Sequence, residues 1–269
     1  MSFNYEQSIW GLGTATLKWS DPAGFRLRQC LESFEKIPAG AKTLEVGCGA
    51  GQFIRAIKRL RPELVCCGCD ISRAAIIAAK TADDGVNYDL NAENRLPYPD
   101  AYFDAVVFFD VLEHVENPSV FAAEIFRVLK PGGVLYGFVP CEGDWLSWWR
   151  WLDKIGLKND LTKKFAGHVN YFSRSEVEKL LAENGFIVSR RRYSEHFLGQ
   201  KIGLWSFFMM ARAARRNGGQ INNEAYFARF SGRWASFFKK IVNALIYLES
   251  AILQRVPSPN FHITAAKKM

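Results

Sequence analysis

The chain has 269 residues, of which 49% are hydrophobic and 23% charged; this balance is typical of a folded protein and excludes a low-complexity or disordered one. A formal net charge of +8 allows an anionic partner, either nucleic acid or a membrane surface, without choosing between them. No uncharged run of about 18 apolar residues occurs, and the first residues lack the pattern of a signal peptide, so we expect a cytoplasmic protein without a spanning helix.

Residues 1–42 form an aromatic-rich leader in which the run from Phe25 to Ile37 has helical spacing. The residues that follow predict a strand, a tight turn and a helix. Leu44 and Val46 belong to an apolar run, three glycines alternate over residues 47–51, and the next eight residues are again helical. Glycine allows the tight turn and the close approach of a ligand to the backbone. The gap between the second and third glycine is shorter than in the dinucleotide fingerprint, so the ligand is nucleotide-like but not predicted to be NAD.

The pattern E-x-G-x-G-x-G after a strand resembles motif I of the class I S-adenosylmethionine-dependent methyltransferases. The resemblance implies a doubly wound α/β fold, with a Rossmann-like seven-stranded sheet that is mostly parallel and has an antiparallel last strand. It implies S-adenosylmethionine as cofactor, held at its amino-acid and ribose parts by the loop residues Glu45, Gly47, Cys48, Gly49 and Gly51. In that family such a leader often folds over the site, which would make Tyr5, Trp10 and Trp19 a lid; packing against the domain is the alternative.

The next two strands should carry further cofactor ligands. The run ending at Asp70 is a short buried strand, and a carboxylate at its tip, next to Ile71, is placed to accept hydrogen bonds from ribose hydroxyls. Asp70 could instead cap the following helix. Residues 87–90 predict a third strand, and by the resemblance either Asp89 or Asn91 lies beside the adenine. An extra residue near Arg95 leaves that choice open.

Residues 104–110 predict the central strand, which includes Phe109 and is apolar as a strand covered on both faces must be. The sequence DVLEHV then predicts the start of a helix at the carboxyl edge of the sheet, with Glu113 and His114 facing the methyl acceptor. A capped, partly exposed helix start is the alternative. A further helix, a Lys-Pro-Gly-Gly turn and a fifth strand should follow, and LKPGG resembles the segment before strand five in many small-molecule methyltransferases.

After the fifth strand, four tryptophans occur within seven residues (Trp145, Trp148, Trp149 and Trp151), a density typical of a hydrophobic pocket, a membrane interface or a core. Ser173 and Glu176 form a capping box for a helix that precedes strand six. His168 lies just before that helix and is the first candidate for a general base, with a structural histidine as the alternative. No cluster has metal-ligand spacing, so the sequence predicts no metal site. The six cysteines are expected to be reduced and buried.

Residues 197–258 form a helical insertion between strand six and a last strand in 261–268. Within it, residues 202–253 are basic and amphipathic, which fits contact with a membrane or lipid, a lid over the acceptor, or subunit packing. The expected organisation is therefore a leader (1–42), a cofactor-binding core (43–196), the helical insertion (197–258) and the last core strand with its tail (259–269).

Together these features predict O-methylation of a hydroxyl on a hydrophobic small molecule, since the layout is loosely similar to the ubiquinone-biosynthesis O-methyltransferases. An RNA methyltransferase is a second reading, suggested by Arg190 to Arg192 and by the Pro140-Cys141 pair, although the Pro-Cys partner expected at strand four is missing. A non-catalytic binding or scaffold protein with the same fold is a third. A protein peripheral on the inner face of a membrane remains compatible with the charge.

Overall fold

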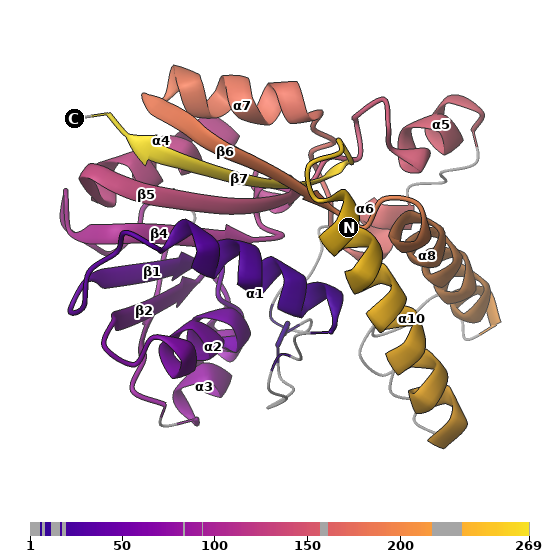
Figure 1. Cartoon of the computed structure of the whole chain (residues 1–269), viewed down its shortest axis with the longest axis horizontal. Helices are drawn as coiled ribbons and strands as arrows, with labels where there is room; N and C mark the ends of the chain where they lie inside the picture. Colours follow the sequence, from indigo (N-terminus) through magenta and orange to yellow (C-terminus); the bar gives the residue numbers. More distant parts are fainter. Residues whose placement is uncertain are drawn as a thin grey trace.

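The computed structural model describes residues 6, 9–11, 17, 20–82, 84–92, 94–156, 161–216 and 233–268. Its centre is one seven-stranded sheet with the order β3-β2-β1-β4-β5-β7-β6 (Figure 1). The strands are β1 (Lys42–Val46), β2 (Val65–Asp70), β3 (Asn87–Leu90), β4 (Phe103–Phe109), β5 (Leu129–Pro140), β6 (Phe186–Ser194) and β7 (Asn260–Lys267). The first five are parallel, whereas β7 runs antiparallel to both β5 and β6. The predicted fold class is confirmed.

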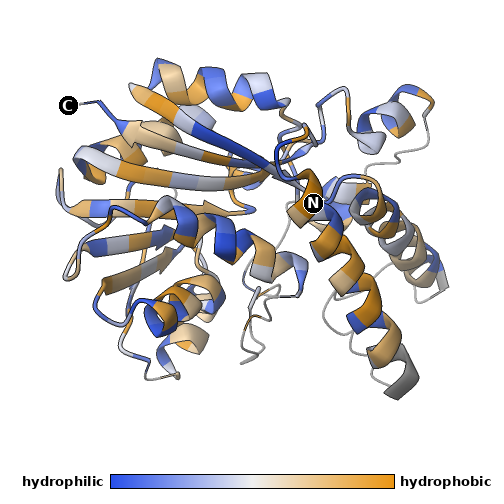
Figure 2. Cartoon of the chain, in the orientation of Figure 1, coloured by the Kyte–Doolittle hydropathy of each residue, from blue (hydrophilic) through white to orange (hydrophobic). Residues whose placement is uncertain are grey.

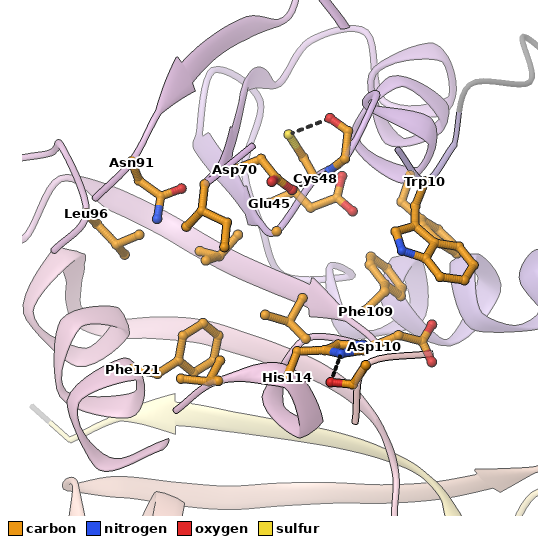
Figure 3. Close-up of a pocket in the computed structure, with 18 of the residues that line it drawn as sticks. Trp10, Glu45, Cys48, Asp70, Asn91, Leu96, Phe109, Asp110, His114 and Phe121 are labelled. Carbon is orange, nitrogen blue, oxygen red and sulfur yellow. Dashed lines mark hydrogen bonds between the residues drawn. The ribbon is translucent and has the colours of Figure 1, made fainter. Parts of the chain in front are cut away.

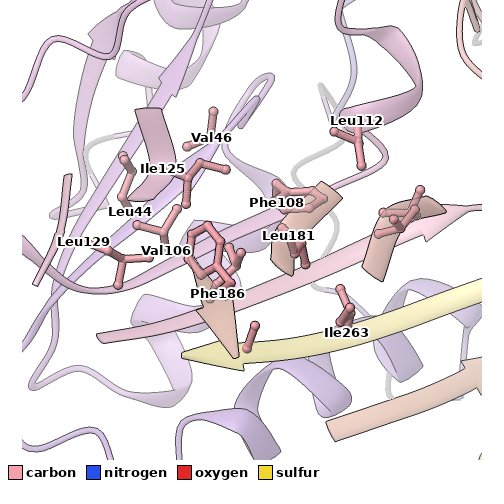
Figure 4. Close-up of a cluster of buried hydrophobic side chains, with 14 of the residues drawn as sticks. Leu44, Val46, Val106, Phe108, Leu112, Ile125, Leu129, Leu181, Phe186 and Ile263 are labelled. Atoms are coloured by element: carbon pink, nitrogen blue, oxygen red, sulfur yellow. The ribbon is translucent and has the colours of Figure 1, made fainter. Parts of the chain in front are cut away.

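Helices cover both faces of the sheet. The helices α1 (Pro22–Ser33), α2 (Gln52–Leu60) and α3 (Arg73–Lys80) lie on one face, and α4 (Pro118–Val128) and α7 (Arg174–Glu183) lie on the other. Successive side chains of β4 alternate between the two layers: Val106 and Phe108 belong to the cluster on the α4 and α7 side, drawn in Figure 4, and Ala105 and Val107 belong to the opposite cluster. This two-sided burial explains why the strand is apolar almost throughout.

A second group of helices stands beyond one end of the sheet (Figure 1). It comprises α5 (Trp148–Lys154), α6 (Leu161–Phe165), α8 (Leu198–Arg216) and α10 (Arg233–Leu253). Leu161 and Phe165 of α6 pack against Met210 and Ala214 of α8. The later half of α10 is anchored to α1, where Arg28 donates a hydrogen bond to the hydroxyl of Tyr247 at 3.0 Å. Within the described residues, no helix is both long and apolar enough to cross a membrane.

Two local predictions were wrong. The sequence DVLEHV forms only a short 3₁₀ turn, η1 (Leu112–His114), and the helix α4 begins at Pro118, where Asn117 caps the backbone N–H of Val120. Proline suits the first turn of a helix because its missing N–H has no intrahelical partner there. The predicted Lys-Pro-Gly-Gly turn belongs to β5, whose pairing with β4 is irregular between Phe103 and Ala105.

Other local predictions were confirmed. Ser173 and Glu176 make the reciprocal capping box at the start of α7. All six cysteines are free and buried. Three predicted aromatic side chains lie outside the described residues: Tyr5 and Trp19 of the leader, and Trp234 in the helical pattern of α10.

Candidate functional site

A cavity of about 570 Å³ opens at the carboxyl ends of β1, β2 and β4 (Figure 3). The strand order reverses direction between β1 and β4, and doubly wound sheets bind ligands at this switch point. The cavity is lined by most of the sequence-predicted residues, namely Glu45, Gly47, Cys48, Gly49, Asp70, Ile71, Asn91, Phe109, His114 and His168. Gly51, Asp89 and Glu113 are not among its lining residues.

The glycine loop is shaped by the leader that crosses it. The carbonyl of Trp10 accepts a hydrogen bond from the backbone N–H of Ala50 at 2.8 Å, and a Cβ atom added to Gly49 would lie 2.6 Å from that carbonyl oxygen. Gly49 also has a positive φ of 52°, which favours glycine. Gly51 lies against the ring of Tyr88, off the cavity wall, and is the N-cap residue of α2. Trp10 and Gly11 of the leader thus contact the loop and line the cavity.

Two carboxylates, Glu45 and Asp70, accept hydrogen bonds from backbone N–H groups in and next to the glycine loop. Glu45 is buried and accepts a hydrogen bond from the backbone N–H of Ile54 at 2.7 Å, and burial raises the pKa of its carboxyl well above the ordinary value. Asp70 accepts hydrogen bonds from the N–H groups of Gly49 at 2.8 Å and Ser72 at 2.9 Å. The side chain that caps α3 is Ser72 and not Asp70. A carboxylate accepts up to about four hydrogen bonds, so Asp70 can also accept from a ligand.

The two candidates at the tip of β3, Asp89 and Asn91, differ in their position relative to the cavity. Asp89 accepts a hydrogen bond from the hydroxyl of Tyr98 at 2.9 Å and lies off the cavity wall. Asn91 lies on the wall, and its buried side-chain oxygen makes no hydrogen bond with any described residue. A buried acceptor without a partner is uncommon in native proteins. Asn91 is therefore the better placed of the two to bind a ligand.

The opposite wall joins an aromatic surface to a polar cluster. Phe109 stacks on Phe53 with ring centroids 3.9 Å apart. Next to it, His114 Nδ1 donates a hydrogen bond to the carbonyl of Gly167 at 3.2 Å, and the ring of His168 lies edge-on to that of His114 with centroids 4.9 Å apart. His168 Nδ1 in turn donates to the Glu142 carboxylate at 2.7 Å. Each hydrogen bond fixes a ring orientation and assigns the hydrogen to Nδ1.

Burial sets the charge states in this cluster. Glu113 is fully buried, and burial raises the pKa of its carboxyl well above the ordinary value. Burial lowers the pKa of His114 to about 4, so its ring is neutral near pH 7. The shortest approach between the two side chains joins His114 Nε2 and Glu113 Oε1 at 3.8 Å.

Sequence reasoning missed an ion-pair network beside this cluster. Arg26 contacts Asp110 at 2.5 Å and Glu195 at 3.0 Å, and its guanidinium lies over the ring of Phe138. Asp110 directly follows the carboxyl end of β4 and Glu142 is the second residue after β5, positions that could have singled them out. Nothing in the sequence pairs them with Arg26 or Glu195, because those residues come from distant segments.

The model of the methyltransferase domain family matches residues 24–189. The chain belongs to this family. The methyltransferase is 35% identical over 98 residues to the ubiquinone/menaquinone biosynthesis C-methyltransferase UbiE of Desulfotalea psychrophila (36% of this chain, 40% of the relative). It is 36% identical to a probable S-adenosylmethionine-dependent methyltransferase of Mycolicibacterium smegmatis (38% and 39%), and 34% identical to a ubiquinone biosynthesis O-methyltransferase of Maricaulis maris (36% and 39%). The chain thus spans about two fifths of the length of these three curated relatives.

Among solved structures, the methyltransferase is similar to the [4+2]-cyclase SpnF, with a TM-score of 0.60 and 17% identity over 97% of this chain and 86% of that one. At this identity the similarity concerns the fold. The cofactor of the methyltransferase is S-adenosylmethionine. The cavity fits it, because Asp70 and the unpartnered oxygen of Asn91 are acceptors suited to ribose hydroxyls and an exocyclic amine, beside the apolar wall of Phe109.

Proposed function

We propose that this methyltransferase methylates a hydroxyl group on a hydrophobic small molecule, such as a phenol from quinone, secondary-metabolite or lipid-related biosynthesis. The observation that carries the proposal is the pair of oriented histidines, His114 and His168, on the wall of a cavity that also contains the glycine loop. Either ring can take up the proton that an acceptor hydroxyl loses when its oxygen is methylated.

The cofactor would be held by the residues at the tips of β1, β2 and β3. We assign the ribose to Asp70, and the adenine to Asn91 with Ile71 and Phe109 as apolar neighbours. We assign the amino-acid part of the cofactor to Glu45 and the loop from Gly47 to Gly49, which includes Cys48. Gly51 shapes the turn, and Asp89 supports Tyr98. When bound, S-adenosylmethionine supplies a methyl group on a good leaving group, so the protein has mainly to align the acceptor and exclude water.

The acceptor hydroxyl would lie against the histidines. Glu142 holds the His168 ring in one orientation through Nδ1, so Nε2 is the nitrogen that can take up a proton. Glu142 is itself fixed by a hydrogen bond from Thr162 at 2.9 Å. His168 is accordingly the first candidate for the general base, and His114 with Glu113 is the second.

An acceptor screen tests this function. We expect purified protein with S-adenosylmethionine to release S-adenosylhomocysteine in the presence of lipophilic phenols, with a methyl ether identified by mass spectrometry. Catechols and hydroquinones with alkyl tails should be better acceptors than the same heads without tails, because the cavity wall is largely apolar. Methylation of ring carbon, or of RNA in a parallel assay, would contradict the proposal.

The RNA alternative has little support in the described residues. Arg190 and Arg191 of the basic run form ion pairs with Glu32 and Glu178, so their charges are already matched within the chain. Cys141, which follows β5, is fully buried, and burial raises the pKa of its thiol well above the ordinary value. A buried, protonated thiol is a poor nucleophile. The scaffold alternative is left with no specific observation.

We further propose that α10 contacts an anionic membrane or lipid surface. Five apolar side chains recur along one stripe of the helix and are all exposed: Phe238, Ile241, Leu245, Leu248 and Ile252. Figure 2 shows hydrophobic residues along much of α10 where it extends away from the sheet. Two exposed lysines, Lys239 and Lys240, lie on the opposite side of the helix from the stripe, as in a basic amphipathic helix. Trp145, Trp151 and Trp205 are exposed as well, and tryptophan is enriched at membrane interfaces.

Liposome co-sedimentation tests this contact. Since a lysine near an anionic surface contributes about 1 kcal/mol, we expect Lys239→Ala and Lys240→Ala each to weaken binding to phosphatidylserine-containing vesicles roughly fivefold. Lys179→Ala, which removes an exposed lysine from α7, is the matched control and should bind as the unaltered protein does. Equal sedimentation with neutral and anionic vesicles, or none with either, would count against lipid contact and favour a role of α10 in acceptor closure or subunit packing.

A further inference from the structure

Three side chains that are separated in the sequence form a group suited to a metal ion. A carboxylate oxygen of Glu113 and one ring nitrogen each of His114 and His168 all lie within 4.8 Å of one another. Sequence spacing gave no sign of this group, because the segment that carries His168 is brought to η1 only by the fold, where the N–H groups of Val169 and Asn170 donate to the carbonyl of Glu113. We propose that Glu113, His114 and His168 bind a divalent transition-metal ion such as Zn²⁺.

The two imidazoles are already oriented as metal ligands. In each ring Nδ1 is engaged by an oxygen, the carbonyl of Gly167 for His114 and the carboxylate of Glu142 for His168. These hydrogen bonds place the proton on Nδ1 and leave the lone pair of a neutral ring on Nε2. Metal-binding histidines commonly donate their other N–H to a carboxylate or carbonyl in this way. We therefore place the ion at Nε2 of both rings, where His114 Nε2 is 3.8 Å from Glu113 Oε1.

Glu113 supplies an independent observation. It is fully buried, and neither of its carboxylate oxygens makes a hydrogen bond with any described residue. A buried carboxylate without such partners is unfavourable unless a cation or a proton compensates it. Its neighbours do not supply the charge, since Glu142 and Asp110 add to the negative potential, and the nearby guanidinium of Arg26 is divided between Asp110 and Glu195. Four carboxylates (Glu113, Glu142, Asp110 and Glu195) thus surround one guanidinium here, in a chain of net charge +8.

The ligand types indicate which ion would bind. Two imidazoles and one carboxylate suit Zn²⁺ and its neighbours in the first transition row, whereas Mg²⁺ and Ca²⁺ prefer ligand sets made of oxygen. Ligand atoms that each lie about 2.0 to 2.2 Å from a tetrahedral zinc are roughly 3.4 Å from one another. The separations here reach up to 4.8 Å, so binding would draw the side chains together. His114 and His168 line the cavity, and a further coordination position would face the acceptor.

Such an ion would help to activate the acceptor hydroxyl, an inference that rests on the proposed function. A hydroxyl bound at the open position loses its proton more readily, because a bound cation lowers the pKa of a coordinated oxygen. The O–H bond would break with release of its proton to solvent, and His168 would then act as a ligand instead of the base. The site itself can be tested without any acceptor.

The test is a titration of untagged protein, stripped with EDTA and desalted, with Zn²⁺ by calorimetry and with Co²⁺ by visible absorption. We expect one site per chain, with a Co²⁺ spectrum of nitrogen and oxygen ligands and no thiolate charge-transfer band. Glu113→Gln and His168→Asn should weaken binding by about 100-fold or more, and Glu142→Gln by about 10- to 100-fold, the usual effect of losing an outer partner.

Matched variants separate this site from the cofactor site and from misfolding. Asp70→Asn should lose S-adenosylhomocysteine and keep the metal, while Glu113→Gln should lose the metal and keep S-adenosylhomocysteine. Glu113→Gln should also melt no lower than the metal-free parent, since it removes a buried carboxylate. Failure of unaltered protein to bind either ion below about 100 µM, or equal affinity in Glu113→Gln and the parent, would overturn the proposal. Metal binding together with a failed phenol screen would instead leave the metal site standing and reject the proposed acceptor.

Discussion

Asp70→Ala is expected to weaken S-adenosylhomocysteine binding by about 100-fold or more. The change removes the carboxylate to which we assigned the two ribose hydroxyls, and hydrogen bonds to a charged group contribute about 1.5 to 3 kcal/mol each. It also removes the acceptor for the N–H groups of Gly49 and Ser72, so the glycine loop loses part of its support. Calorimetric titration of the parent and the variant with S-adenosylhomocysteine, S-adenosylmethionine and NAD measures the effect, and NAD should bind to neither.

Asp89→Asn is the matched control for this prediction. It alters a carboxylate at the tip of the neighbouring strand, and the structure places that carboxylate on the hydroxyl of Tyr98 and off the cavity wall. We expect its affinity to stay within about threefold of the parent. The assignment of the ribose to Asp70 fails if the two variants bind alike, and a loss confined to Asp89→Asn would transfer the role to β3. Asn91→Ala should fall between the two, since it removes one neutral acceptor.

The part of the cavity wall around the glycine loop could be predicted from the sequence because its information is local. Glu45, the glycines and Asp70 lie within one strand-turn-helix-strand unit, and each has a position in that unit that the chemistry of the turn requires. The central strand was predictable for a similar reason, since a strand buried on both faces has few alternatives. Order along the chain and periodicity together were sufficient for the fold class.

The contacts around the two histidines could not be predicted in the same way, because they join distant segments. The orientation of His168 depends on Glu142, and the position of Asp110 depends on Arg26 from α1. Glu113 illustrates the limit most clearly. The helix predicted to start at this point would have turned the carboxylate toward the acceptor. Instead the helix begins only at Pro118, after the cap Asn117, and the 3₁₀ turn before it buries Glu113. Choosing Asn91 over Asp89 likewise required the partner of Tyr98.

His168→Ala should lower kcat for the acceptor identified in the screen by roughly 10²- to 10⁴-fold, the range typical of losing a group that handles a proton in the rate-limiting step. Affinity for S-adenosylhomocysteine should stay within about twofold, because the cofactor ligands proposed above lie at the tips of β1, β2 and β3 and make no hydrogen bond to this ring. Initial rates at saturating cofactor, combined with a calorimetric titration, separate the two quantities. His196→Gln is the matched control, since His196 is a buried histidine whose Nε2 donates to the carbonyl of Val256, and a glutamine amide can replace that bond.

The size and pattern of the loss decide how His168 acts. If it orients or activates the acceptor hydroxyl, Glu142→Gln should give a smaller loss of about tenfold, because the ring remains but its orientation is less well fixed. Added Zn²⁺ should raise the rate of stripped parent protein and leave His168→Ala unchanged if the ring is a metal ligand, and should affect neither if the ring is a simple base. An unchanged kcat in His168→Ala would remove this residue from the chemistry and leave His114 as the group next to the acceptor. The same result would weaken the proposal of a hydroxyl acceptor, since the oriented pair of histidines is the observation that supports it.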